Sequence, residues 1–284
     1  MESHTVGGAV APTMTDRPRF LSRLGLADAV TAGNAALGTL AAVAAAVDPT
    51  LAARLVLLAA VADGLDGVLA RRYGGTPVGP HLDSLADVAS FGVAPALIVA
   101  ATVTGSYPLD SAPAVYAAGL VVPAAYVALA VIRLAVYNVE DEGAKTTHGV
   151  QTTLAATVIA ASVLAGLDSP AVVLGLAAVS APLMVTPVRY PDLHPQDALV
   201  MGVVQACAIL LTGMAGESFA FALLFLALGY LVLGPRFYWR DVSESAEDPD
   251  DQAGESTEDP GGSTDDPADP GDAAPGTDDH ELGA

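Results

Sequence analysis

Blocks of about 20 mostly apolar residues follow one another through most of the chain, separated by short polar connections. A helix of that length crosses the hydrocarbon core of a bilayer, which is about 30 Å thick. A soluble domain with 52% hydrophobic residues and a mean hydropathy of +0.50 would need an unusually large core. The sequence therefore predicts an all-α, polytopic integral-membrane helical bundle. Its eight predicted spans are 25–47, 51–72, 83–105, 112–137, 150–168, 169–188, 198–214 and 217–235.

The two ends of the chain lack such blocks. Residues 1–20 are predicted to be a disordered N-terminal segment, with Met1 or Met14 as the start of translation, and 21–240 to be the membrane domain. Residues 241–284 hold sixteen acidic residues and no Lys or Arg, among many Pro, Gly, Ser and Thr, which predicts a disordered cytoplasmic tail. An acidic tail and a net charge of −21 are typical of a protein from a high-salt organism.

The basic residues predict the orientation in the membrane. An even number of spans places both termini on one side. If that side is cytoplasmic, ten of the eleven basic residues lie inside and only Arg54 lies outside. This bias follows the positive-inside rule. The sequence thus predicts a multi-pass cell-membrane protein with both termini, and the junction of the second and third spans, facing the cytoplasm.

That junction carries four aspartates inside apolar sequence, in the stretch DGLDGVLARRYGGTPVGPHLDSLAD at residues 63–87. Ionisable residues in such segments are costly without partners, and they mark function by default. Four neighbouring carboxylates repel one another, so we expect a cation among them. Oxygen-only ligands favour a hard divalent ion, Mg²⁺ or Mn²⁺, with two ions expected in the site. The expected metal ligands are Asp63, Asp66, Asp83 and Asp87.

Helical spacing explains how these carboxylates could meet. The first two aspartates share one helical face with Gly67 and Arg71, and the last two lie one turn apart on a second face with Gly79. The glycines and proline between them are typical of a turn, so the two helices run antiparallel. Gly67 and Gly79 leave room for a ligand near the backbone, and the Arg71 guanidinium suits a phosphate. The arrangement predicts displacement at phosphorus, with one carboxylate accepting the proton of an attacking hydroxyl.

The same stretch resembles the signature of CDP-alcohol phosphatidyltransferases, D-x₂-D-G-x₂-A-R-x₈-G-x₃-D-x₃-D. Every fixed residue is present, and the one departure is a gap of seven residues instead of eight between Arg71 and Gly79. The resemblance implies a membrane bundle with a six-helix catalytic core, usually a homodimer. It also implies transfer of a phosphatidyl group from a CDP-activated lipid to an alcohol, with release of CMP. Asp87 would be both a metal ligand and the general base, and Gly67, Arg71 and Gly79 would bind the CDP part of the lipid.

The first span adds a weaker match. TAGNAALG at residues 31–38 resembles the T-x₂-N-x₃-G stretch of the family. By this resemblance Thr31 and Asn34 would line the nucleotide site. Helix packing is the alternative role for such residues in a membrane span.

Three stretches resemble the phosphatidylserine-synthase branch of the family: DSLADVASFGVAPA from residue 83, IRLAVYN from residue 132 and LMVTPVRYP from residue 183. Val136 replaces the second arginine of that branch's R-L-A-R-F-N, and residues 149–153 lack both prolines of its G-L-P-x-P. An archaeal subgroup acting on isoprenoid-ether lipids could carry such changes. The resemblance thus favours transfer of a phosphatidyl-type group, here an archaetidyl group, to the hydroxyl of L-serine.

Serine requires a partner for its carboxylate. The residues expected to bind the acceptor are Arg133, Asn138, Lys145 and Arg189, whose alternative role is contact with lipid headgroups. The other expected partners are the CDP-activated lipid, membrane lipids and a second copy of the chain, with no nucleic acid.

Two other functions remain open. In the first, glycerol phosphate or inositol phosphate is the acceptor, which would require several cations near the aspartates, where the chain has few. In the second, the aspartates belong to a cation transporter. Transporters place such sites near the midplane between two repeated halves, whereas these aspartates are predicted at one surface beside an arginine.

Overall fold

The computed structural model describes residues 24–140, 146–191 and 195–237. The predicted terminal segments 1–20 and 241–284 lie outside these residues. The helices are α1 (Leu26–Ala44), α2 (Pro49–Tyr73), α3 (Gly79–Asp87), α4 (Ala94–Ser106), α5 (Pro113–Glu140), α6 (Thr152–Leu164), α7 (Pro170–Leu183), α8 (Pro195–Leu210) and α9 (Gly213–Phe237). A π-helical segment, η2 (Val88–Val93), joins α3 to α4, so that residues 79–106 form one continuous helix.

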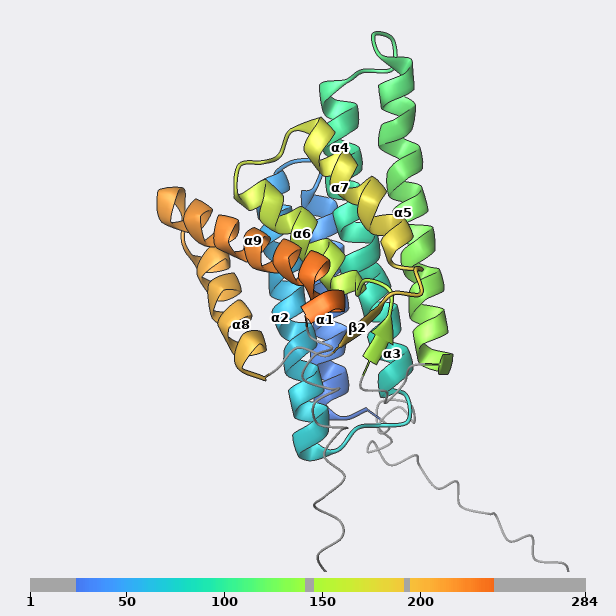
Figure 1. The fold of residues 1–284 in the computed structure, drawn as a ribbon, viewed down its shortest axis with the longest axis vertical. Coiled ribbons are helices and arrows are strands. Elements are labelled where there is room, and N and C mark those ends of the chain that lie inside the picture. Colours follow the sequence, from blue (N-terminus) through green and yellow to red (C-terminus); the bar gives the residue numbers. More distant parts are fainter. Residues whose placement is uncertain (1–23, 141–145, 192–194, 238–284) are drawn as a thin grey trace, which may run out of the picture. The chain divides into compact units, whose positions relative to one another are not determined.

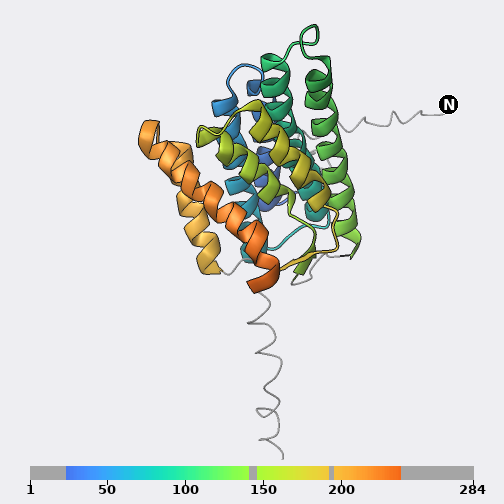
Figure 2. The same cartoon turned by 45° about the horizontal axis from the view of Figure 1, so that its top comes forward.

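The helices form a bundle around α6, in which every residue except Thr153 is buried (Figure 1). On one side of the bundle α5 packs against α4 and α7. On the other side α8 packs against α2, and α9 packs against α6 and α8, as the turned view also shows (Figure 2). The pair α1 and α2 makes the most extensive helix contact among the described residues. These two helices and α3 carry the predicted site residues of the first three spans.

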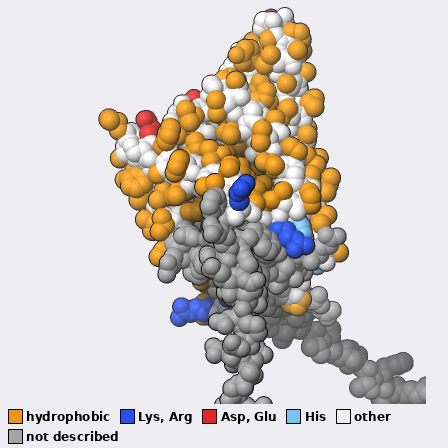
Figure 3. Space-filling view, in the orientation of Figure 1, with side chains coloured by type: hydrophobic (Ala, Val, Ile, Leu, Met, Phe, Trp, Pro, Cys, Tyr) orange, Lys and Arg blue, Asp and Glu red, His pale blue; other side chains and the backbone are white. Residues whose placement is uncertain are grey.

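Length and hydropathy confirm the membrane character. Four helices, at Leu26–Ala44, Gly79–Ser106, Pro113–Val139 and Gly213–Arg236, are long and apolar enough to cross a membrane. Three shorter apolar helices and the charge-bearing α2 complete the eight helical stretches, at the positions that the sequence predicted. Hydrophobic side chains cover most of the face seen in Figure 3, and the visible Lys and Arg side chains lie toward its lower end.

The connection between α2 and α3 is built as the sequence predicted. At its start, α2 is capped by Asp48, whose carboxylate accepts a hydrogen bond from the Leu51 N–H at 3.0 Å. The helix ends at Tyr73 and is followed by Gly74, whose φ of 90° is a conformation that few residues other than glycine adopt. The third helix then begins at Gly79, four residues before its predicted start, with Pro80 in its first turn.

The π-helical segment was not predicted, and it lies directly after the aspartates. It meets α1 at Gly38, where an added Cβ would collide with Ser90. The Ser90 hydroxyl donates a hydrogen bond to the Asn34 carbonyl oxygen at 2.8 Å. A small residue and a hydroxyl thus allow close approach of two helix backbones. Single-turn π segments are frequent at functional sites.

A short two-stranded sheet is a second unpredicted feature of this otherwise helical chain. Strand β1 (Thr146–His148) pairs antiparallel with β2 (Arg189–Pro191), and His148 lies opposite Arg189. The next residue, Gly149, has a φ of 72° and lies so near the Met184 carbonyl that a side chain would collide with it. Its N–H donates to Val188 O at 2.8 Å. These contacts fix the chain that leads into α6.

Candidate active site

Three of the four predicted metal ligands form a compact group. Carboxylate oxygens of Asp63 on α2 and of Asp83 and Asp87 on α3 all lie within 4.8 Å of one another. The Oδ1 atoms of Asp83 and Asp87 are buried and accept no hydrogen bond from the described residues. Buried carboxylate oxygens without donors are costly unless a cation neutralises them. The group therefore fits a hard divalent cation, as the sequence predicted.

The fourth predicted ligand lies beside this group. Asp66 accepts a hydrogen bond from the Thr31 hydroxyl at 2.6 Å, across the contact between α1 and α2. The same hydroxyl lies 3.1 Å from the Ala27 carbonyl oxygen of its own helix, so its one proton is shared between the two acceptors, with the shorter contact to Asp66. Asp66 is therefore anchored to α1. It lines a cavity that Asp83 also lines, whereas Asp63 and Asp87 do not.

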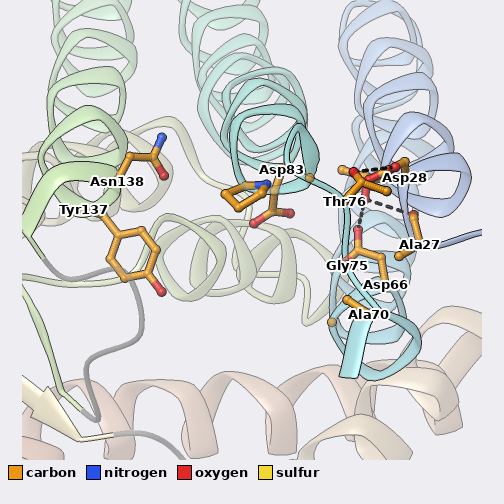
Figure 4. A pocket seen from close by; sticks show the side chains of 13 residues that line it. Ala27, Asp28, Asp66, Ala70, Gly75, Thr76, Asp83, Tyr137 and Asn138 are labelled. Carbon is orange, nitrogen blue, oxygen red and sulfur yellow. Dashed lines mark hydrogen bonds between the residues drawn. The ribbon is translucent and has the colours of Figure 1, made fainter. Parts of the chain in front are cut away.

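That cavity, called the first cavity, has a volume of about 300 Å³. It lies between α1, α2, the start of α3 and the end of α5 (Figure 4). Among its lining residues are Thr31, Gly67 and Gly79, three of the five residues predicted to bind the CDP part of a lipid. The two glycines leave the wall free of side chains, as expected for a ligand that approaches the backbone.

Sequence reasoning missed one residue of this cavity. Asp28 on α1 is only 3% exposed, and its Oδ2 accepts hydrogen bonds from the Thr76 hydroxyl at 2.8 Å and the Gly25 N–H at 2.7 Å. Its Oδ1 lies 3.4 Å from where a Cβ of Gly79 would be. The available signal was an aspartate three residues before Thr31, which places both on one face of an apolar helix.

The other two residues predicted for CDP do not line the first cavity. Asn34 is fully buried at the contact of α1 with η2, and neither atom of its side-chain amide is hydrogen-bonded within the described residues. Arg71 is exposed on α2, and its guanidinium lies 3.5 Å from where a Cβ of Gly67 would be. Arg71 thus lies at the edge of the first cavity, one helical turn beyond Gly67.

A second cavity, of about 210 Å³, lies on the other side of the carboxylate group. It is lined by Asp63, Asp83, Ser84, Asp87, Arg133, Leu134, Tyr137, Gln151, Thr152 and Thr153. Arg133 is 8% exposed, and its charge acts on Asp87. The first turn of α6 also borders this cavity, and the N–H groups of a first turn have no partner within their own helix. The second cavity therefore combines a buried cation, free N–H groups and three carboxylates.

Among the described residues predicted for the acceptor, Arg133 alone lines the second cavity. Asn138 lines the first cavity instead, and its Oδ1 accepts a hydrogen bond from Ser84 at 3.0 Å. Arg189 is exposed on β2, where its Nε donates to His148 Nε2 at 3.2 Å, and it lines neither cavity. Lys145 lies outside the described residues.

A third cavity, of about 550 Å³, borders the second between α2, α6, α8 and α9. The two cavities share Asp63, Gln151 and Thr153. Apart from Asp63, the described lining is uncharged, and much of it is apolar. Two of its polar side chains have hydrogen bonds elsewhere: Gln205 Nε2 donates to Leu57 O at 2.7 Å, and Thr157 donates to Thr153 O at 2.8 Å.

Fold and site together define a class of protein: an integral-membrane helical enzyme with an acidic, cation-fitting centre between two cavities. Comparison with known proteins specifies it further. The model of the CDP-alcohol phosphatidyltransferase family matches residues 24–186, more than half of the chain. The chain belongs to the CDP-alcohol phosphatidyltransferase family, and it is a membrane transferase of phospholipid biosynthesis.

Several named proteins are similar to this chain, and two of them illustrate the likeness. The archaetidylserine synthase of Methanothermobacter thermautotrophicus is 31% identical over 191 residues, which cover 65% of this chain and 77% of that protein. The CDP-diacylglycerol–serine O-phosphatidyltransferase of Mycobacterium tuberculosis is 38% identical over 97 residues, or 34% of this chain and 31% of that protein. The family match ends before α8, so α8 and α9 lie outside it.

Proposed function

We propose that the protein transfers a phosphatidyl-type group, here an archaetidyl group, from a CDP-activated lipid to the hydroxyl of L-serine and releases CMP. The observation that carries this proposal is the second cavity, in which the buried Arg133 lies beside Asp87. The names of the two relatives, both of which specify serine, support the same acceptor.

A small zwitterion suits the second cavity. The carboxylate of serine would pair with the Arg133 guanidinium, an ion pair strengthened by burial and by two-point hydrogen bonding. The first-turn N–H groups of α6, at Thr152 and Thr153, favour negative charge at the same place. The hydroxyl of the bound serine would then extend toward Asp87. The other predicted acceptor residues remain proposals. Asn138 is hydrogen-bonded to Ser84 of the second cavity, Arg189 lines neither cavity, and Lys145 lies outside the described residues.

A phosphorylated acceptor suits the cavity less well. Glycerol phosphate or inositol phosphate would bring a doubly charged group, which needs more than one cation. Arg133 is the one Lys or Arg in the described lining of the second cavity, and three carboxylates face it there. Repulsion between the phosphate and these carboxylates would oppose binding.

The first cavity is proposed to bind the CDP part of the lipid. Thr31, Gly67 and Gly79 line it, and Arg71 lies at its edge, where the guanidinium would contact a phosphate. The Asp28 carboxylate can accept a hydrogen bond from the cytosine amino group or a ribose hydroxyl. Asn34, which has no described partner, would hold the adjacent helix contact or a water near the site.

The four aspartates are proposed to hold two divalent cations, Mg²⁺ or Mn²⁺. When bound, such ions neutralise the diphosphate and stabilise the leaving group. Asp87 would take the proton from the serine hydroxyl, whose oxygen forms the new bond to phosphorus as the bond to CMP breaks. Asp66, held by Thr31, would fix the nucleotide-side ion, and Asp63 and Asp83 would hold the ions at the reacting phosphorus.

The hydrocarbon chains of the lipid are proposed to enter the third cavity. Its wall is largely apolar, and it adjoins the reacting centre at Asp63. An added Cβ at Gly202 would meet nothing within 4 Å, so this wall has room for a ligand. The positive-inside bias supports a site on the cytoplasmic face with both termini inside, and family resemblance supports a homodimer.

One assay tests the proposal. The purified full-length protein would be given CDP-archaeol and Mg²⁺ or Mn²⁺, with L-serine, glycerol phosphate or inositol phosphate in parallel, while CMP and the product lipid are measured. We expect CMP release that depends on L-serine and yields a serine-bearing lipid. Release only with a phosphorylated acceptor would overturn serine as the substrate. Cation flux into proteoliposomes without CMP release would instead indicate a transporter.

A further inference from the structure

The first and second cavities share two lining residues, Asp83 and Tyr137. Every other residue in the described lining belongs to one cavity or the other. Figure 4 shows Asp83 between Asp28 and Thr76 on one side and Tyr137 and Asn138 on the other. If the nucleotide of the lipid lies in the first cavity, as proposed, its phosphorus would meet the acceptor at the boundary that Asp83 and Tyr137 line.

The Tyr137 ring is held in this place by its neighbours. It lies one helical turn after Arg133, whose guanidinium carbon is 5.7 Å from the ring centroid, within the range of a cation–π contact. The next residue, Asn138, accepts a hydrogen bond from Ser84, which follows Asp83 on α3. One end of α5 is thus tied to α3 beside the shared carboxylate.

We propose that Tyr137 is a positioning residue that separates the two cavities and keeps water from taking the place of the acceptor alcohol. This inference rests on the proposed function. The side reaction that it would suppress is hydrolysis. In that reaction a water oxygen forms the bond to phosphorus, the bond to CMP breaks, and the water proton passes to Asp87, which yields a phosphorylated lipid and CMP. A transferase loses activated lipid in this way whenever water reaches the phosphorus before the acceptor does.

The ring, more than the hydroxyl, carries the proposed role. An aromatic face between the two cavities supplies an apolar wall without a donor or acceptor for water. Removal of the ring would join cavities of about 300 and 210 Å³ around the reacting phosphorus. Removal of the hydroxyl alone would leave the wall in place.

The test compares Tyr137→Ala with Tyr137→Phe at saturating L-serine in H₂¹⁸O. The measured quantity is the ratio of phosphorylated lipid carrying ¹⁸O to serine-bearing lipid. We expect Tyr137→Ala to raise this ratio about tenfold, as a shift of on the order of 1.4 kcal/mol between competing barriers would do. Tyr137→Phe should keep the low ratio. Tyr107→Ala, at the far end of α4, is the matched control and should leave transfer and ratio unchanged.

Each outcome of this test either supports or overturns the proposed role of Tyr137. If Tyr137→Ala slows both products in proportion and leaves the ratio unchanged, Tyr137 has a merely structural role and the inference is wrong. If that variant does not fold, Tyr137→Leu keeps part of the wall, and an unchanged ratio there overturns the inference equally. Wild-type protein that makes no serine-bearing lipid refutes the proposed function instead, and the ratio is then measured with whichever acceptor supports transfer.

Discussion

The first and second cavities lie on either side of one carboxylate, yet they are assembled differently. The first is built mainly from α1, α2 and the start of α3, within residues 27–83, and much of it falls in one short motif. The second collects residues from α2, α3, α5 and α6, over residues 63–153. The part of the site that is proposed to bind the shared CDP group is thus local in sequence, whereas the part proposed to select the acceptor depends on tertiary packing.

This difference has a physical basis. A cavity between consecutive helices is fixed by helical spacing and one turn, which sequence patterns encode directly. A cavity between distant helices depends on how α5 and α6 pack, and small changes there alter its shape without touching the motif. We therefore expect substitutions in the first cavity to affect use of the CDP-activated lipid, and substitutions in the second to affect use of the acceptor.

The largest expected effect is at the carboxylate that serves the second cavity. Asp87→Asn removes the proposed base and one charged metal ligand, so kcat should fall by about 10²–10⁴-fold, the range for loss of a general base. Binding of the CDP-activated lipid, measured by calorimetry with Mg²⁺ present, should be largely kept because three ligands remain. Normal turnover would exclude Asp87 as the base, and loss of lipid binding would make it chiefly a ligand.

Arg133→Ala should distinguish most clearly between the proposed roles of the two cavities in substrate binding. Loss of a buried, charged hydrogen-bond partner costs about 1.5–3 kcal/mol, so the KM for L-serine should rise about 10–100-fold. The KM for the CDP-activated lipid should stay near the wild-type value. Arg189→Ala is the matched control, because Arg189 is paired with His148 away from both cavities. A larger rise in the KM for L-serine in Arg189→Ala than in Arg133→Ala would indicate that serine binds near β1 and β2 instead.

The sequence was most informative where function depends on local spacing. The eight helices, the turn after Tyr73 and the carboxylate group all follow from apolar block length and offsets of three and four residues. Asp28 lies outside the motif, but an ionisable residue in an apolar span is costly without a partner and marks function by default. The sequence therefore contained the information that identifies Asp28.

Other features could not be predicted from the sequence. The π segment at 88–93 interrupts a continuous apolar pattern, and it lies where Ser90 closely approaches Gly38 of α1. The β1–β2 pair joins residues about 43 positions apart and has three residues per strand, too few for a periodic signal. Tyr137 lines both cavities only because α5 packs beside α3. Each of these depends on long-range packing.

A smaller effect is expected from Asp28→Asn in the first cavity. The substitution keeps the side-chain shape but removes a charged acceptor for the nucleotide, which costs on the order of 1 kcal/mol, or about fivefold in the KM for the CDP-activated lipid. The KM for L-serine should not change. Asp48→Asn, at the cap of α2 and away from both cavities, is the matched control. If Asp28→Asn alters the KM for L-serine instead, the assignment of the CDP-activated lipid to the first cavity and of serine to the second is wrong.

The smallest expected effect concerns the third cavity, which borders only the second. Gly202→Leu would place a side chain in the space proposed for the lipid chains, where an added Cβ now meets nothing within 4 Å. Displacing one or two CH₂ groups from an apolar wall costs about 0.8 kcal/mol each, so the KM for a long-chain CDP lipid should rise about 4–15-fold. A short-chain CDP lipid should bind as it does to the wild-type protein.

The matched control is Gly175→Leu, on the exposed side of α7, which introduces the same side chain where the proposal expects no change. An equal rise for short and long chains would mean that Gly202 affects the reacting centre through α8 packing, and that the hydrocarbon chains lie elsewhere.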